Sequence, residues 1–259
     1  MVNKIPSNDK GMKENKLIVV VPTYNAELYI EKCLESILNQ DYDNYEVIVI
    51  DDCSTDNTQS IINRVGEKYS NGFTVHRNTE RVGSPLAAFI KGIELISRDD
   101  EDIIITVDGD DWLAGARVLS YINKVYQDEN IYMTYGQYEP LSGTYHNYCK
   151  PIPNTQKYRE SGKWLASHLR TVKRKLFNKI DKNDLKDTNG EYYKCAGDAA
   201  YMYPIIEMAG HKHIKFIEEV LYIYNDNNPL NEMKSDLNVH ISIVNEIKSK
   251  KVYNEIETL

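Results

Sequence analysis

The stretch IIITVDGDDWL at residues 103–113 joins an apolar run to a cluster of carboxylates. Its first part, Ile103–Val107, is β-branched throughout, which is typical of a buried strand in a parallel sheet. The run ends in three acids, Asp108, Asp110 and Asp111. Open α/β sheets bind ligands beyond the carboxyl ends of their strands, so these acids stand where a ligand site is expected.

The first two acids form an Asp-Gly-Asp motif with a spacing suited to metal binding. Asp108 and Asp110 are two residues apart, so in an extended chain their side chains project to the same side. Two carboxylates on one side repel each other unless a cation lies between them, and Mg²⁺ and Mn²⁺ both favour oxygen ligands. We expect Gly109 to leave room for a bulky ligand near the backbone. A plain surface turn is the alternative, since Asp and Gly are ordinary turn residues.

The residues before this stretch alternate between strand-like and helix-like patterns. Such alternation implies a parallel sheet with right-handed crossovers, whose strands end along one edge. Polar groups follow three of the four expected strands, at residues 23–25, at Asp51 with Asp52, and at the acid cluster. We therefore expect these groups to form one site. The expected strands cover 17–21, 47–50, 73–76 and 103–107, and the expected helices cover 27–39, a segment starting near 53–56, and 84–96.

The residues after the acid cluster give a mixed pattern. Pro204 predicts a break or kink in the helix that contains it. The last helix has an apolar face, for which packing within the protein is the first interpretation; pairing with a second copy and contact with a membrane surface are the alternatives. The expected helices cover 118–125, pieces of 164–177, 195–208 and 237–256, and the expected strands cover 131–138, 214–217 and 220–224.

Composition narrows the class of protein. The 259 residues include 31 Lys and Arg against 39 Asp and Glu, and this net charge of −8 argues against nucleic acid as the main partner. No apolar run has the length of a membrane span, and the first 16 residues lack the apolar core of a secretory signal. The four cysteines are widely spaced, which favours reduced thiols, no zinc site and a cytoplasmic location; peripheral contact with the inner face of a membrane stays open.

One segment is basic within this acidic chain. Residues 163–182 carry seven Lys or Arg side chains against one acid. Local positive charge of this kind indicates an anion site, and Arg offers a fixed fork that suits phosphate oxygens. We therefore take His168 and Arg170 as candidates for contact with a donor diphosphate or a phosphorylated acceptor. The alternatives are a solvated helix face for the lysines and a hydrogen-bonded structural role for His168.

Three motifs together resemble those of the family 2 glycosyltransferases of GT-A fold. They are VVVPTYN at 19–25, VIVIDDCSTDNT at 47–58 and VDGDDWL at 107–113, and their order and spacing match the family. The resemblance implies an α/β, Rossmann-like and mostly parallel sheet flanked by helices, with a C-terminal extension on the acceptor side. It implies a glycosyltransferase domain at 16–232. The polar composition of 1–15 predicts a mobile lead-in, and the apolar pattern of 233–259 predicts a C-terminal amphipathic helix. Within the domain, 16–113 would bind the nucleotide sugar and 114–232 the acceptor.

The resemblance also assigns roles to the donor-binding residues. Pro22, Thr23 and Tyr24 would hold the nucleotide base and ribose, with Asn25 in the same turn. Asp52 would accept a hydrogen bond from the base, as in members that use uridine donors. The Asp-Gly-Asp motif, residues 108–110, would contact ribose and metal, with Asp108 and Asp110 as the metal ligands.

The segment GDAAY, residues 197–201, resembles the acid-containing segment that supplies the catalytic base of inverting members. Asp198 is therefore the expected base, with an acid on the helix surface or at the helix N-terminal cap as the alternative. The chain departs from the family at three places. Gly197 replaces an acid, Ala88 and Phe89 stand where an Arg and an Asn are usual, and the metal-binding His of a late loop is missing.

These residues imply an inverting glycosyltransferase of the hexosyltransferase type. It would transfer a sugar from a nucleoside diphosphate donor, with UDP favoured, to a hydroxyl of a glycan or lipid-linked saccharide. Mn²⁺ or Mg²⁺ is the expected cofactor, and the last helix could support an oligomer. The alternatives are an inactive module of the same fold that binds nucleotide sugars, and a nucleotidyltransferase that forms them. The second should carry a Gly-rich phosphate loop after the first strand, and PTYNAE is not one.

Overall fold

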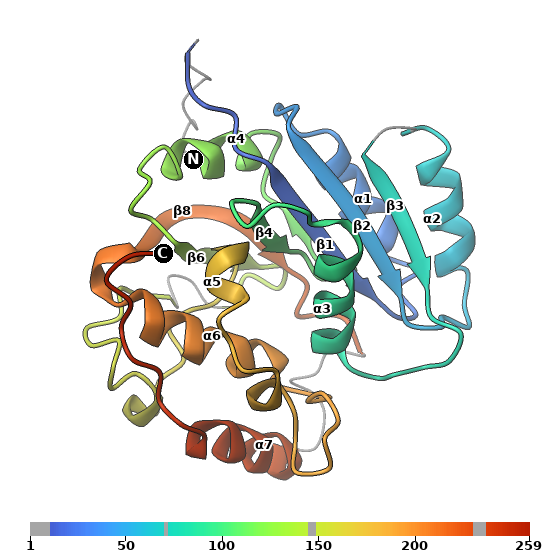
Figure 1. Cartoon of the computed structure of the whole chain (residues 1–259). Coiled ribbons are helices and arrows are strands. Elements are labelled where there is room, and N and C mark those ends of the chain that lie inside the picture. The colour runs from blue at the N-terminus through green and yellow to red at the C-terminus, as the bar shows by residue number, and fades with distance from the viewer. Residues whose placement is uncertain (1–10, 70–71, 145–148, 230–236) are drawn as a thin grey trace.

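The computed structural model describes residues 11–69, 72–144, 149–229 and 237–259. Within these residues a single sheet has the strand order β3-β2-β1-β4-β7-β6-β8-β5, with helices on both sides (Figure 1). The strands are β1 (Leu17–Thr23), β2 (Tyr45–Asp51), β3 (Phe73–Arg77), β4 (Ile103–Thr106), β5 (Trp112–Leu113), β6 (Met133–Pro140), β7 (Thr171–Lys173) and β8 (Ile214–Tyr224). The helices are α1 (Ile30–Leu38), α2 (Thr58–Gly66), α3 (Pro85–Ile96), α4 (Val118–Val125), α5 (Arg174–Phe177), α6 (Gly197–Ala209) and α7 (Leu237–Ser249), with short 3-10 turns at Arg159–Ser161, Lys182–Leu185 and His211–His213.

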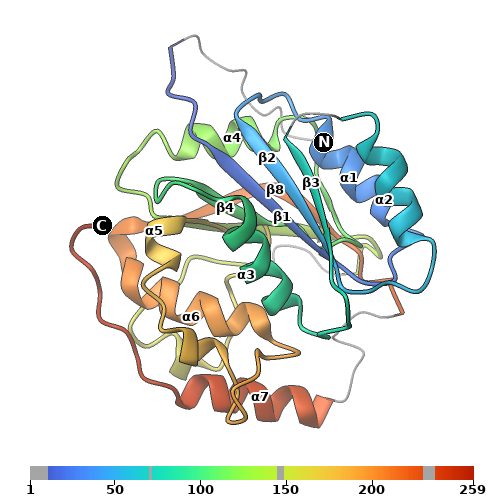
Figure 2. The ribbon, with the colours of Figure 1, turned by 45° about the vertical axis from the view of Figure 1, so that its right-hand side comes forward.

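The parallel half of the sheet is buried on both faces. Strands β4, β1, β2 and β3 are parallel neighbours, with Leu17 opposite both Tyr45 and Ile103. Along β1, Val19 and Val21 pack toward α1, whereas Ile18 and Val20 pack toward α3. Figure 2 shows α1 and α2 on one side of these strands and α3 on the other. Burial on both faces is why the strands read as continuous apolar runs rather than alternating ones.

The other half of the sheet is mixed. Strand β7 is antiparallel to β4 and β6, β6 is parallel to β8, and β8 is antiparallel to β5. The prediction of helical pieces over 164–177 is wrong for most of that segment, because Thr171–Lys173 forms a strand and only Arg174–Phe177 is helical. Thr171 and Val172 are β-branched and buried between β4 and β6, and this tertiary pairing overrides the local pattern.

Helix α6 lies beside the mixed half of the sheet (Figure 1) and continues through Pro204 without a break. Of the predicted break or kink, the break is therefore wrong. Every residue from Ala199 to Ala209 is buried, and this packing holds the helix despite the missing backbone donor. The first turn of α6 lies close to α3. A Cβ atom on Gly197 would be 2.7 Å from Cβ of Leu86, so a larger residue at this position would force α3 and α6 apart.

The C-terminal helix packs on the protein through Ile247, as expected, but Leu237 and Ile241 of its apolar face are exposed, and the helix is shorter than predicted. It ends at Ser249, and the chain then runs back along α6 (Figure 2). There Tyr253 N donates to Glu207 Oε2 (3.0 Å) and Ile256 N donates to the Met208 carbonyl (2.8 Å), in place of further helical bonds. Ile247 is buried against the core. None of the helices in the described part of the chain has the length and apolarity needed to cross a bilayer.

Candidate active site

The ends of β1, β2 and β4 meet at one edge of the sheet, as the sequence predicts. The carbonyl of Thr23 accepts a hydrogen bond from Asp52 N (2.9 Å), and the carbonyl of Pro22 accepts one from Gly109 N (3.0 Å). The turn after β1 therefore joins the acid that follows β2 to the acids that follow β4. Asp52 and the Asp108–Asp110 turn lie on the same side of the molecule, which is the spatial condition for a shared site.

The turn after β1 is fixed by its own polar groups. Asn25 has a positive φ of 47°, its backbone N donates to Ser54 Oγ (2.9 Å), and its Oδ1 accepts from Thr55 N (2.8 Å). This residue thus orders the loop after β2. Tyr24 is half-buried, and the guanidinium carbon of Arg81 lies 3.9 Å from the centre of its ring.

Asp52 is buried and organises the loop that precedes α3. Its Oδ1 accepts from Asn78 Nδ2 (2.7 Å) and Val82 N (2.9 Å), and its Oδ2 accepts from Gly83 N (2.7 Å). The protein therefore already holds this carboxylate in place. A nucleotide base that contacts Asp52, as the family resemblance implies, would donate to a lone pair that these three bonds leave free.

Three acids crowd the end of β4. Asp108 and Asp110 are half-buried and Asp111 is fully buried. Burial raises the pKa of Asp108 to about 6, with Asp110 and Asp198 adding to the rise and Arg170 opposing it. Burial likewise raises the pKa of Asp110, and burial with the charges of Asp110 and Asp108 raises that of Asp111. Crowded carboxylates of this kind are destabilised as anions unless a cation joins them.

The donor atoms fit a divalent metal ion. In the described part of the chain, one ligand atom each of Asp108, Asp111 and His168 lie within 4.8 Å of one another. Oxygen donors with one imidazole suit Mn²⁺, and burial, followed by the charges of neighbouring acids, raises the pKa values of Asp108 and Asp111 at the same place. The predicted ligands were Asp108 and Asp110; this grouping contains the first of them and adds Asp111 and His168.

Sequence reasoning missed the residues that hold Asp110 and Asp111. Tyr222 on β8 donates its hydroxyl to Asp111 Oδ2 (2.7 Å), and Asn225 N donates to Asp111 Oδ1 (2.7 Å). Asn228 Nδ2 donates to Asp110 Oδ2 (2.6 Å). The only available signal was the polar run NDNN at 225–228 directly after a strand.

The structure explains the glycine at position 109 differently from the sequence-based expectation. Gly109 does not leave space for a ligand, because a Cβ atom there would lie 2.5 Å from Thr23 Oγ1 and 3.1 Å from the Pro22 carbonyl. The glycine lets the acid turn pack directly on the end of β1.

His168, Arg170 and Asp198 come together beside the acids. Arg170 Nη1 donates to Asp198 Oδ2 (2.8 Å), and Arg170 Nη2 lies 3.2 Å from ring nitrogens of His168. The His168 ring stacks on Tyr222 with centroids 4.3 Å apart. Burial and the charge of Arg170 hold the pKa of His168 well below its usual range, so the ring is neutral at pH 7. Asp198 is more accessible, with 35% of its side chain exposed.

The lysines of the basic segment do not join this cluster. Lys173 donates to the Glu129 carbonyl, Lys175 pairs with Glu101 and Lys182 pairs with Glu94. The alternative of a solvated face fits Lys182, which is exposed and ion-paired, whereas Lys173 is buried in β7.

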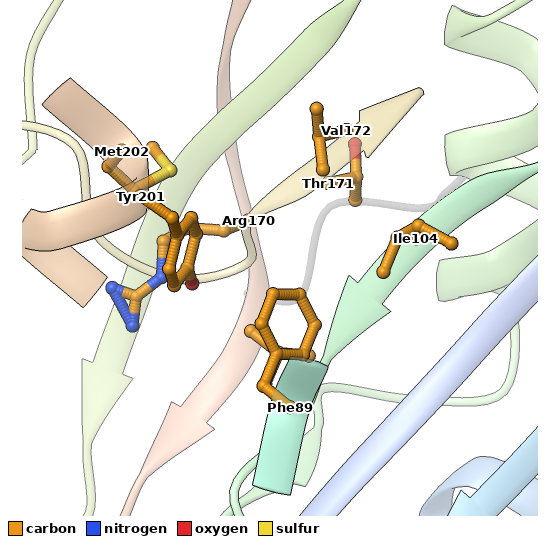
Figure 3. A pocket seen from close by; sticks show the side chains of 8 residues that line it. Phe89, Ile104, Arg170, Thr171, Val172, Tyr201 and Met202 are labelled. Atoms are coloured by element: carbon orange, nitrogen blue, oxygen red, sulfur yellow. The ribbon is translucent and has the colours of Figure 1, made fainter. Parts of the chain in front are cut away.

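Helix α3 places apolar rather than polar side chains beside Arg170. Phe89 packs against Tyr201, with centroids 5.2 Å apart, and both line a small pocket next to Arg170 (Figure 3). Ala88 is also buried. The departure from the family pattern at Ala88 and Phe89 thus removes polar contacts from this helix.

Fold and site together define an α/β protein with a cluster of carboxylates at the carboxyl edge of its parallel strands. Residues 18–183 match the model of glycosyl transferase family 2, and the chain belongs to this family.

Curated relatives agree with this assignment. The chain is 32% identical to a poly(ribitol-phosphate) beta-glucosyltransferase of Bacillus spizizenii, over 49% of this chain and 20% of that protein. It is 35% identical to an uncharacterized glycosyltransferase of Haemophilus influenzae, over 46% of each protein. The glycosyltransferase GlyG of Streptococcus pneumoniae is 27% identical, over 80% of this chain and 69% of that protein. The chain thus spans less than half the length of the first two relatives.

Solved structures confirm the GT-A fold. Staphylococcus aureus TarS superposes with a TM-score of 0.61 at 21% identity, over 81% of this chain and 36% of that one. The mannosyltransferase PcManGT of Pyrobaculum calidifontis, in complex with GDP-Man and Mn²⁺, superposes with a TM-score of 0.62 at 20% identity, over 95% of this chain and 69% of that one.

Proposed function

We propose that this chain transfers a sugar from a nucleoside diphosphate donor to an acceptor hydroxyl, with metal assistance and inversion at the anomeric carbon. The observation that carries the proposal is the convergence at one sheet edge of Asp52, the three acids after β4, and the accessible Asp198. Family membership supports the reaction class, and the expected acceptor is a hydroxyl of a glycan or lipid-linked saccharide; relatives named as poly(ribitol-phosphate) glycosyltransferases support a polymeric acceptor.

On the donor side, Pro22, Thr23 and Tyr24 would hold the base and ribose, and Asp52 would accept a hydrogen bond from the base. A uridine donor is favoured because TarS structures hold UDP and UDP-GlcNAc. Asp108 and Asp110 would hold the metal ion, with Asp111 and His168 beside them. When bound, a divalent ion supplies counter-charge to the diphosphate leaving group as a Lewis acid.

On the acceptor side, Asp198 would take the proton from the attacking hydroxyl. Its place in the first turn of α6 and its exposure to solvent support this role. A carboxylate within hydrogen-bond reach of the hydroxyl typically contributes about 10²- to 10⁴-fold as a general base. A single displacement with one base inverts the anomeric carbon, and no covalent intermediate is needed.

Asp198→Asn tests the assignment. We expect the variant to bind UDP with Mn²⁺ as the wild type does in calorimetry, while transfer from a UDP-sugar falls by about 10²- to 10⁴-fold. Asp41→Asn, which changes an exposed carboxylate, is the matched control and should keep wild-type rates. Full turnover by Asp198→Asn would exclude Asp198 as the base. A wild-type protein that binds UDP but turns over none of a panel of nucleotide sugars would instead identify an inactive binding module.

A further inference from the structure

We propose that Arg170 is a positioning residue that holds the carboxylate of Asp198 over the acid cluster. This inference rests on the proposed function, in which Asp198 accepts the acceptor proton. It differs from the expectation that Arg170 contacts donor phosphate, and one experiment separates the two roles.

Arg170 is placed by the sheet rather than by a flexible loop. It directly precedes β7, and only 6% of the residue is exposed. Figure 3 shows its guanidinium beside the ring of Tyr201, with the nitrogens directed away from Phe89 and Ile104. A long side chain that is buried in this way has already lost its rotamer freedom, so it can fix a partner without a further entropy cost on ligand binding.

Both Nη atoms of Arg170 already have partners within the protein. Nη1 donates to Asp198 Oδ2 (2.8 Å), and Nη2 lies against the His168 ring. The second oxygen of Asp198 is also held, because Oδ1 accepts from Ala199 N (2.8 Å). Both oxygens of this carboxylate are therefore oriented, although the side chain is about one-third exposed.

Charge supports the same role. Arg170 lies between the acids after β4 and the first turn of α6, and its positive charge acts on Asp108 as well as on Asp198. The rings of His168 and Tyr201 lie beside the guanidinium. Without this cation, like charges would drive Asp198 away from Asp108, toward solvent. Displacement of a reacting group by about 1 Å can cost about 10²-fold in rate.

The test is a double-mutant cycle of Arg170→Met and Asp198→Asn, with Arg170→Lys as the conservative variant. We expect Arg170→Met to lower kcat by about 10- to 100-fold while the UDP–Mn²⁺ affinity changes by less than about threefold. In the Asp198→Asn background the same substitution should have little further effect, because a residue that acts through another is not additive with it. Arg170→Lys keeps the charge and should recover part of kcat.

Arg159→Met is the matched control, since Arg159 pairs with Glu207 at the other end of α6 and is also buried. It should lower the melting temperature and leave kcat of the folded enzyme unchanged. If Arg170→Met does not fold, Arg170→Lys takes its place in the cycle. Additive effects, or a loss of UDP–Mn²⁺ affinity of tenfold or more in an Arg170 variant, would overturn the positioning role alone. A wild-type protein without transfer activity would overturn the proposed function and this role with it.

Discussion

Gly109 lies directly against Thr23, so that a Cβ atom on Gly109 would be 2.5 Å from Thr23 Oγ1 and 2.7 Å from Thr23 Cβ. The acid turn is thereby packed on the last residues of β1. We expect Gly109→Ala to push this turn away from β1 and to lower the free energy of unfolding by about 1–3 kcal/mol, as other overpacked sites do. UDP–Mn²⁺ binding should weaken in parallel. Urea unfolding and calorimetry would measure both, and wild-type binding by the variant would contradict the proposed place of the turn in the metal site.

Asp52 accepts three hydrogen bonds from the loop before α3, and this makes its substitution informative. Asp52→Asn would turn an NH₂ group toward an N–H donor of Val82 or Gly83 and leave that donor unsatisfied. The expected cost is about 1–3 kcal/mol of stability, together with weaker UDP binding. Asn78→Ala is the control, because it removes one donor and leaves the two backbone bonds. If that variant weakened UDP binding as much as Asp52→Asn does, the side chain of Asn78 would be the important one.

The N-terminal half of the fold could be predicted from sequence because its strands are buried on both faces. The run LIVVV at 17–21 marks β1, which extends two residues further, to Thr23. Parallel topology then fixes where Asp52 and the later acids meet. Strand β7 could not be found this way, because three residues within a basic segment form a strand only through their partners β4 and β6.

The residues of the candidate site also differ in whether the sequence alone could predict them. Asp108, Asp110 and Asp198 stand in motifs with local signals, whereas their partners are remote in sequence. Tyr222 is 111 residues from Asp111, and Asn228 is 118 residues from Asp110. Only the folded sheet, in which β8 returns beside β5 and β6, brings these pairs together. The local sequence pattern therefore predicts the acids, whereas the residues that orient them are identified only in the folded structure.

The buried ion pair of Arg159 and Glu207 ties three segments together. The pair is 2.5 Å long, Arg159 Nη1 also donates to the Ile247 carbonyl (2.9 Å), and Glu207 accepts from Tyr253 N. Removal of one partner would leave a buried charge, so we expect Arg159→Met to cost about 3–5 kcal/mol in the free energy of unfolding. Chemical denaturation would measure this loss. A loss below about 1 kcal/mol, as is typical of surface pairs, would show that the C-terminal segment packs without this pair.

Asp108 should make the stability of the metal-free protein depend on pH. Burial first, and then Asp110, raise its pKa from the ordinary value of 3.8 to about 6. Between these values the folded state binds a proton that the unfolded chain has released. The free energy of unfolding should therefore fall as the pH rises from about 4 to about 6, by up to about 3 kcal/mol. Asp108→Asn removes the contribution of Asp108 to this dependence and leaves those of Asp110 and Asp111, so the metal-free variant should be more stable than the wild type above pH 6.

With a bound metal ion, the wild type should be more stable than Asp108→Asn above pH 6. Mn²⁺ binds ionised carboxylates, so it should stabilise the wild type increasingly as the pH rises above 6 and should stabilise Asp108→Asn far less. Urea unfolding at pH 4.5, 6 and 7.5, in EDTA or in Mn²⁺, measures both effects in one series, with Asp41→Asn as a surface control. If EDTA-treated wild type were as stable at pH 7.5 as Asp108→Asn, Asp108 would carry no buried charge. If Mn²⁺ then stabilised both proteins equally, Asp108 would be excluded as a metal ligand, and Asp110 with Asp111 would remain to hold the ion.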